Sequence, residues 1–157
     1  SFLLDHKVEI KQALQIWQNQ PDKVIKVLQQ RLAENQKDVT ARRLLANLYL
    51  RTKQYDQAFK ALKPLFAQNK KDVSISLLMA EILLRQDKTK AGLLIMQKIM
   101  ADKSTDANVL LIIGQLAASV GEKKQALQAW RLARAILVSQ GQNVGLLDQS
   151  IDQLLAS

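Results

Sequence analysis

The chain has 157 residues, 48% of them hydrophobic but only 4% aromatic, and a formal net charge of +9. This length suffices for one domain with its own core, while two prolines and five glycines argue against a loop-rich or all-β fold. The lack of cysteine excludes disulfides and thiolate chemistry, and no apolar run approaches the roughly 20 residues of a membrane-spanning helix. Because the sequence starts at Ser1, we expect a fragment or processed form, with any signal peptide or anchor upstream.

Apolar residues recur with helical periodicity along the whole chain, interrupted by short polar segments. This pattern predicts helices over residues 3–18, 22–35, 39–52, 56–69, 73–86, 90–102, 107–119, 123–139 and 146–156. Aspartates stand at or just before the first turn of five of them, where a carboxylate can accept hydrogen bonds from free backbone N–H groups. These residues are Asp22, Asp38, Asp56, Asp72 and Asp106.

Other residues mark helix ends or conflict with the helical pattern. Asn35, Asn69 and Gly121 suit helix C-termini, because Asn and Gly tolerate the left-handed backbone conformation found there. Pro64 falls inside a predicted helix, lacks an N–H group and should kink the helix or end it early.

Small residues recur every 34 positions along the middle of the chain. One series is Ala46, Ala80 and Gly114, and a second, 12 residues later, is Ala58, Gly92 and Ala126. Small side chains at matching positions of two helices allow their axes to approach closely. A period of this length is typical of stacked helix pairs, which usually bind other proteins and do not catalyse reactions.

The repeat divides the chain into three parts of a single domain spanning residues 1–157. Gln12 and Val24 stand where small residues belong, so residues 1–38 are predicted to form an atypical N-terminal hairpin. Residues 39–140 hold three regular repeats. Residues 141–157 supply a capping helix whose apolar stripe would seal the open end. The stripe consists of Leu146, Leu147, Ile151, Leu154 and Leu155.

The skeleton of small residues resembles the tetratricopeptide repeat, which places them at the eighth and twentieth positions of a 34-residue unit. Tyr49 also matches the usual aromatic residue at the eleventh position. The usual Trp at the fourth position and Pro at the thirty-second are absent, so the resemblance rests on helix packing. It implies an all-α fold, a right-handed α-solenoid of helix hairpins with a C-terminal capping helix.

A narrower resemblance concerns two stretches, RLAENQKDVTARRLLANLYLRTKQYDQA and QALQAWRLARAILVSQGQNVGLLDQSIDQLL. They are similar to the opening and final repeats of the tetratricopeptide subunit of bacterial c-type cytochrome biogenesis (haem lyase) complexes, although Gln36 replaces that family's usual Pro. The resemblance implies a periplasmic, membrane-anchored domain that holds apocytochrome c for haem attachment. Two alternatives stay open: an adaptor of a secretion, pilus or envelope machine, and a basic domain that docks on anionic lipid or nucleic acid. A cytoplasmic location is the alternative to the periplasm.

The tetratricopeptide resemblance implies a concave groove lined by the first helix of each hairpin. The residues predicted to line the groove lie on the exposed side of that helix. They fall into an apolar strip, a polar strip and a basic edge. They are Arg43, Leu44, Asn47, Leu50, Arg51, Leu77, Leu78, Glu81, Leu84, Arg85, Asn108, Leu111, Ile112 and Gln115. Such a groove suits an amphipathic helix or an extended tail with carboxylates. Alternatively, the leucines belong to the core between repeats and the arginines are simply solvated.

The sequence contains no set of residues typical of a catalytic, metal-binding or phosphate-binding site. His6 is the only histidine, so no Ser/His/Asp set is complete, and it has no second ligand at metal spacing. The glycines match no phosphate-binding fingerprint. We therefore predict no catalytic residue, no metal, no cofactor and no enzyme activity.

The expected partner is a protein or peptide, with apocytochrome c or another assembly subunit as candidates. We expect a membrane contact only through an upstream anchor. Nucleic acid is disfavoured because no aromatic platform accompanies the positive charge.

Overall fold

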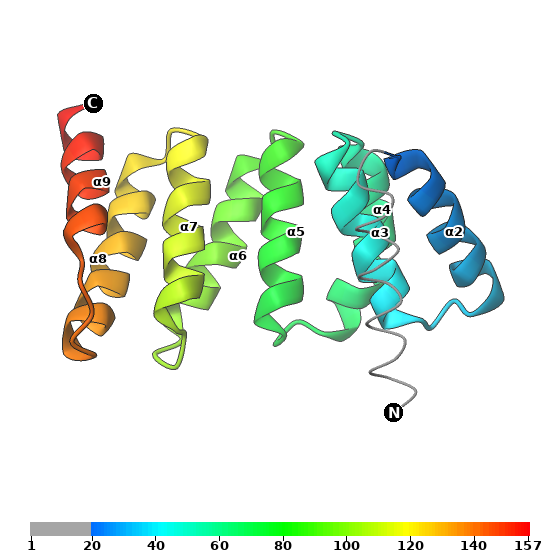
Figure 1. Cartoon of the computed structure of the whole chain (residues 1–157), viewed down its shortest axis with the longest axis horizontal. Helices are drawn as coiled ribbons and strands as arrows, with labels where there is room; N and C mark the ends of the chain where they lie inside the picture. The colour runs from blue at the N-terminus through cyan, green and yellow to red at the C-terminus, as the bar shows by residue number, and fades with distance from the viewer. Residues whose placement is uncertain (1–19) are drawn as a thin grey trace. The chain divides into compact units, whose positions relative to one another are not determined.

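The computed structural model describes residues 20–157, and every regular element in that range is an α-helix (Figure 1). In chain order these are α2 (Pro21–Glu34), α3 (Val39–Arg51), α4 (Tyr55–Gln68), α5 (Val73–Arg85), α6 (Thr89–Ala101), α7 (Ala107–Ser119), α8 (Lys123–Ser139) and α9 (Gly145–Ala156). The all-α fold of consecutive helix hairpins predicted from the sequence is confirmed, with helix ends displaced by at most one residue. The helix expected over 3–18, together with His6 and Gln12, lies outside the described residues.

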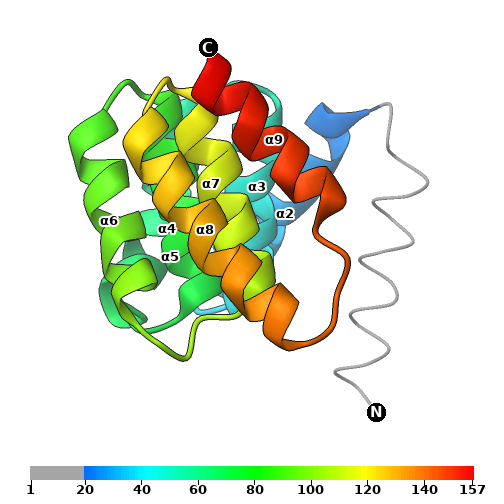
Figure 2. The ribbon, with the colours of Figure 1, turned by 90° about the vertical axis from the view of Figure 1, so that its left-hand side faces the viewer.

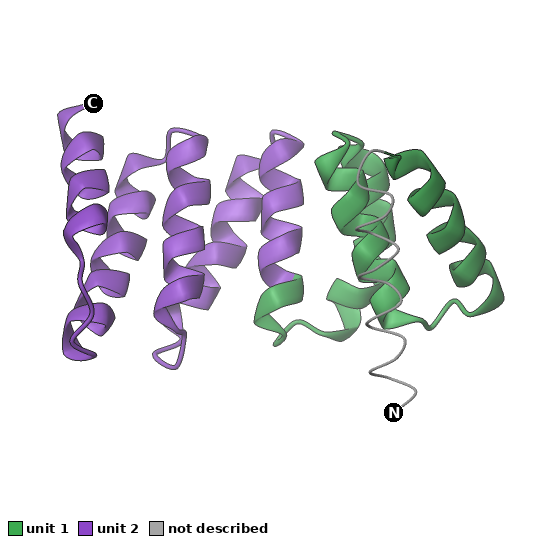
Figure 3. Ribbon diagram, viewed as in Figure 1, with its two compact units in different colours: residues 1–75 green, residues 76–157 purple. Residues whose placement is uncertain are grey.

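The chain divides into two compact units, with the boundary inside α5 between Ile75 and Ser76 (Figure 3). In the first unit, α2 packs on α3 and α3 packs on α4. In the second unit, α7 packs on α8, and α8 packs on α9 (Figure 2). The assignment of residues 1–157 to one domain stays a prediction. None of the helices in the described part of the chain is both long and apolar enough to span a membrane.

An aspartate caps the first helix of each regular repeat. Asp38 Oδ1 accepts from Ala41 N at 3.0 Å, Asp72 Oδ1 from Ile75 N at 3.1 Å, and Asp106 Oδ1 from Val109 N at 2.9 Å. The backbone bond from Ile75, aided by Ser74 and the charge of Arg43, lowers the pKa of Asp72. Asp22 and Asp56 lie instead within the first turns of α2 and α4.

The turn inside each hairpin uses a left-handed residue at the same place in the repeat. Lys53, Asp87 and Gly121 have φ of 61°, 60° and 78°, and they follow one another at the 34-residue period. Each turn carries the two backbone bonds of a Schellman motif. In the first turn, Lys53 N donates to Leu50 O and Gln54 N donates to Tyr49 O. Only Gly121 was expected from the sequence, because lysine is not typical of this conformation and aspartate adopts it less readily than glycine.

Asn35 and Asn69 end helices as expected, but not in the left-handed conformation. Their φ angles are −143° and −130°, so the prediction of left-handed asparagines was wrong. Asn69 instead closes its helix through its side chain, since Nδ2 donates to Leu65 O at 2.9 Å. These asparagines lie between hairpins, and in both connections the backbone N–H of the capping aspartate donates to the asparagine carbonyl.

The small residues of the repeat lie at helix crossings. Ala46, Ala58, Ala80 and Ala126 are fully buried, and both glycines of the series are buried with them. A Cβ at Gly92 would lie 3.0 Å from Ala80 O and 2.9 Å from Leu84 Cδ2. A Cβ at Gly114 would overlap Cδ1 and Nε1 of the Trp130 indole. The close approach predicted from the sequence is therefore present between α5 and α6, and at Gly114 an aromatic ring occupies the space.

Two local expectations have different outcomes. The early end expected at Pro64 does not occur, because α4 continues through Pro64 to Gln68. The C-terminal helix α9 forms as expected and buries Ile151 against the rest of unit 2. Arg134 Nε on α8 donates to Asp148 Oδ1 on α9 at 2.6 Å and ties the two helices together. Leu146 of the predicted apolar stripe does not contribute to this packing, since it is 82% exposed.

The hairpin turns give a first prediction about stability. Replacing Lys53 by glycine should raise the free energy of unfolding by up to about 1 kcal/mol, since a left-handed L-residue costs roughly 1–2 kcal/mol and glycine entropy offsets part of the gain. Asp87→Gly should gain less, because aspartate tolerates the conformation better. Gly121→Ala should lower the free energy of unfolding by about 1 kcal/mol through the same backbone strain. No steric clash adds to this loss, because no atom lies within 4 Å of the added Cβ. Urea denaturation checks this rank order, which a stabilising Gly121→Ala would contradict.

The crossing at Gly114 gives a second prediction. Gly114→Ala should lower the free energy of unfolding by about 1–3 kcal/mol, because overpacking against Trp130 outweighs the roughly 1 kcal/mol helical advantage of alanine. In a Trp130→Leu background the same change should become neutral or stabilising, since the indole no longer fills the space. Thermal or urea denaturation of the four proteins measures the coupling. An equal loss in both backgrounds would show that the indole is not the cause.

Candidate functional site

The residues predicted to line the groove divide by burial. Leu50 and Leu84 are buried, so these two side chains belong to the packing between helices and are not available to a partner. Leu44, Leu77, Leu78 and Leu111 are half-buried. Ile112 is the most exposed apolar residue of the set, at 44%. The alternative that the leucines are core residues therefore holds for two of them.

The polar members of the set are mostly accessible. Arg43, Arg51, Arg85, Asn108 and Gln115 are exposed, while Asn47 and Glu81 are half-buried. Each compact unit presents its own share of these residues. Unit 1 carries Arg43, Leu44, Asn47 and Arg51 on α3.

We call the corresponding surface of unit 2 the first-helix face. It consists of Leu77, Leu78, Glu81 and Arg85 on α5, and of Asn108, Leu111, Ile112 and Gln115 on α7. Figure 1 shows α5 and α7 in front of α6 and α8, so the two first helices form one layer. The face is weakly charged, because α7 contains no ionisable residue and α5 contains only Glu81 and Arg85. Its apolar side chains and amides suit an amphipathic peptide.

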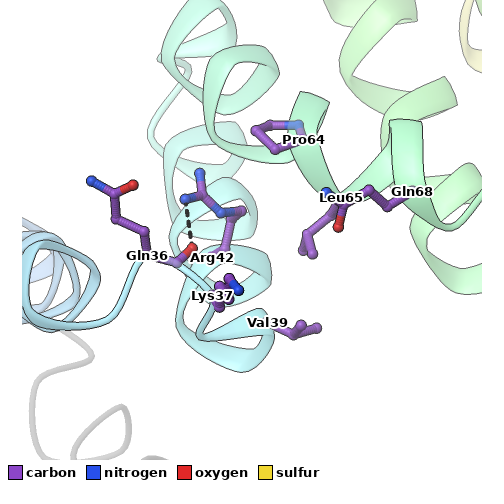
Figure 4. Close-up of a pocket in the computed structure, with 7 residues that line it drawn as sticks. All are labelled: Gln36, Lys37, Val39, Arg42, Pro64, Leu65 and Gln68. Atoms are coloured by element: carbon purple, nitrogen blue, oxygen red, sulfur yellow. Dashed lines mark hydrogen bonds between the residues drawn. The ribbon is translucent and has the colours of Figure 1, made fainter.

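A separate hollow of about 370 Å³ lies in unit 1 (Figure 4). It is formed by the α2–α3 loop, the first turn of α3 and the second half of α4. Its lining combines apolar and cationic side chains: Gln36, Lys37, Val39, Arg42, Pro64, Leu65 and Gln68. None of these residues was predicted as a site residue, because they come from three elements and share no spacing in the sequence.

Arg42 holds the walls of this hollow together. Its Nη2 donates to Gln36 O in the loop at 3.0 Å (the dashed line in Figure 4), and its Nη1 donates to Ala61 O on α4 at 3.4 Å. Pro64 has no N–H group, so the carbonyl of Lys60 lacks its usual helical donor, and Arg42 brings a donor to the next carbonyl along the helix. The guanidinium thus joins α4, near its proline, to the α2–α3 loop.

The groups with a shifted pKa in the described part of the chain take part in local hydrogen bonds. Arg134 lowers the pKa of Asp148 by a direct hydrogen bond, and Asp148 in turn raises the pKa of Arg134. The Ser104 hydroxyl lowers the pKa of Asp102. Within residues 20–157, no three His, Cys, Asp or Glu side chains lie close enough to hold a metal ion. The expectations of no catalytic residue, no metal and no cofactor stay predictions, and His6 lies outside this part.

Comparison with known families agrees with the repeat pattern. A family model described as "Tetratricopeptide repeat" matches residues 15–82 and again residues 49–116. The two matches together cover well over half of the chain. No curated protein and no solved structure gives a significant match.

The contacts of Arg42 give a third prediction. Arg42→Ala should lower the free energy of unfolding by about 1–3 kcal/mol, because two hydrogen bonds from a charged donor are lost. Arg43→Ala is the matched control, since Arg43 is the exposed neighbour on the same helix and should change stability by no more than about 0.5 kcal/mol. Hydrogen exchange should show faster opening of residues 35–38 and 61–66 in Arg42→Ala alone. Equal effects of Arg42→Ala and Arg43→Ala on stability would show that the Arg42 hydrogen bonds do not hold the loop and α4 together.

Proposed function

The chain belongs to the tetratricopeptide repeat family, and from this premise we propose that it is a non-catalytic scaffold that binds a peptide or helix of a protein partner. Repeats of this kind generally mediate protein–protein binding, because stacked hairpins present an extended surface built from equivalent positions. The proposed binding surface in unit 2 is the first-helix face.

One observation carries this assignment: large apolar side chains remain accessible at equivalent positions of successive first helices. Ile112 on α7 is 44% exposed, and Leu78, one repeat earlier on α5, is half-buried. Together with the half-buried leucines of α5 and α7, Ile112 makes an accessible apolar strip with little charge, and such a strip favours contact with a partner. Gln115 lies one turn further along α7 and offers an amide to the same ligand.

The chemistry of this face points to an amphipathic occupant. Leu78 and Ile112 would receive the apolar side of a helix or extended tail, and Arg85 would meet its carboxylates. In unit 1, Leu44 and Arg51 offer the same pair of groups on α3. A partner with alternating apolar and acidic residues would satisfy either set.

We further propose that the scaffold is a periplasmic assembly factor for c-type cytochrome maturation, with apocytochrome c as its peptide ligand. The support is the resemblance of residues 31–58 and 125–155 to the opening and final repeats of the haem lyase subunit. An adaptor of a secretion, pilus or envelope machine is the alternative of the same class. Both the cytochrome assembly factor and the adaptor would bind their ligand on the first-helix face. Variants of this face therefore test where the ligand binds, and the choice of peptide tests which of the two roles the protein has.

The fourth prediction tests the face with a matched pair of exposed residues. Ile112→Asp should weaken binding of a C-terminal apocytochrome c peptide at least tenfold, because a carboxylate would be buried against an apolar ligand side chain. Leu94→Asp on α6 is the control, since Leu94 is also exposed, at 54%, but lies outside the first-helix face. Both proteins should keep the same thermal midpoint. Fluorescence anisotropy of a labelled peptide measures the affinity.

The outcomes separate the two levels of the proposal. An equal loss of peptide binding in Leu94→Asp and Ile112→Asp would overturn the first-helix face as the binding surface. No binding of apocytochrome c peptides to the unmodified chain would overturn the cytochrome role. Loss of binding in Ile112→Asp alone supports both.

A further inference from the structure

The charge of unit 2 is divided unequally between its helices. The second helices of its hairpins, α6 and α8, contain only cations: Lys90 and Lys98 on α6, and Lys123, Lys124, Arg131 and Arg134 on α8. Neither helix has an acidic residue. The first helices carry no excess charge, because Glu81 balances Arg85 on α5 and α7 has no ionisable residue. The positive charge of these two hairpins is therefore concentrated on the second helices.

These helices are neighbours with matching orientations. The buried side chain of Gln125 on α8 donates through Nε2 to Leu93 O on α6 at 3.2 Å. Lys90, Leu94 and Lys98 are exposed and follow one another at four-residue steps, so they share one side of α6. Lys124 lies one repeat after Lys90, and Arg131 lies two turns further along α8; both are exposed. We call Lys90, Leu94, Lys98, Lys124, Arg131 and Leu132 the outer cationic face.

The other charges of these helices have partners. Arg134 pairs with Asp148 on α9, and Lys123 Nζ donates to Ser157 O at 2.7 Å. The carboxylates closest in sequence, Asp87, Asp102 and Glu122, lie beyond the helix ends in the turns. Asp102 is itself engaged by Ser104 N and Oγ at 2.9 and 2.7 Å. The cations of the outer cationic face therefore remain available to an external anion.

Large apolar side chains stand among these cations. Leu94, 54% exposed, lies between Lys90 and Lys98, and Leu132, 40% exposed, follows Arg131. A surface that combines lysine and arginine with exposed leucine suits the boundary between lipid headgroups and acyl chains. Nucleic acid would favour aromatic stacking groups, yet α6 has none, and Trp130 on α8 directs its Nε1 inward to Leu111 O at 3.3 Å.

We propose that the outer cationic face docks unit 2 on a membrane surface rich in anionic phospholipids. This inference goes beyond the proposed protein-binding function and uses the opposite layer of helices. Cations near an anionic bilayer each strengthen binding about fivefold, and salt screens this attraction. Leu94 and Leu132 add contact with the acyl boundary that salt does not screen. Docking through α6 and α8 leaves the first-helix face open to its protein ligand.

The fifth prediction concerns vesicle binding by the full chain. The protein should co-sediment with vesicles of phosphatidylcholine and phosphatidylglycerol at low salt, and should not co-sediment with phosphatidylcholine alone. Lys98→Gln combined with Lys124→Gln should weaken binding on the order of twentyfold, since two cations are removed. Lys23→Gln combined with Lys26→Gln is the control. These lysines are exposed on α2, and their replacement changes net charge equally.

Two further measurements separate the possible causes. Leu94→Ser should reduce the binding that remains at high salt, because the apolar contact is lost while the charge is kept. Ile112→Asp should leave vesicle binding unchanged, so a failed protein-binding role is distinguishable from a failed membrane role. Absence of binding to the mixed vesicles, equal losses in both lysine pairs, or tighter binding to a DNA duplex than to the vesicles would overturn the proposal.

Discussion

The packing of each hairpin follows from its small residues, which leave room at the helix crossings. Gly114 leaves space that the Trp130 indole occupies, and Gly92 lets α6 lie directly against the Ala80 carbonyl. A hairpin closed in this way buries its large side chains above and below the crossing. Such tight hairpins can then follow one another along the chain.

The same geometry fixes the two connections of each repeat, and it uses a different device for each. Inside a hairpin the chain must reverse within a few residues, so Lys53, Asp87 and Gly121 adopt left-handed backbone angles. Between hairpins a short turn leads to an aspartate cap such as Asp72, whose backbone N–H donates to Asn69 O. In unit 2 these connections separate the first helices, α5 and α7, from the second helices, α6 and α8.

This separation gives each layer a different surface. The first helices α5 and α7 present apolar and amide side chains with little charge, whereas α6 and α8 present lysine, arginine and exposed leucine. Within unit 2 the helical cations thus gather on one layer, because α6 and α8 carry lysine and arginine without any acidic residue. The hollow around Arg42 is a third feature, in which a cation is used to hold a loop and a proline-containing helix together.

The repeat, the helix bounds and the first-helix positions could all be predicted, because each follows from the spacing of residues along the chain. The burial of Leu50 and Leu84 and the exposure of Ile112 could be seen only in the folded chain, since burial depends on which neighbouring helix covers a residue; tertiary packing decides it. Tertiary packing also decides that Lys53 is left-handed and that Arg42 joins residues from α4 and a loop. Closure of the hairpin overrides the backbone preference of lysine, and contacts between distant elements leave no local pattern in the sequence.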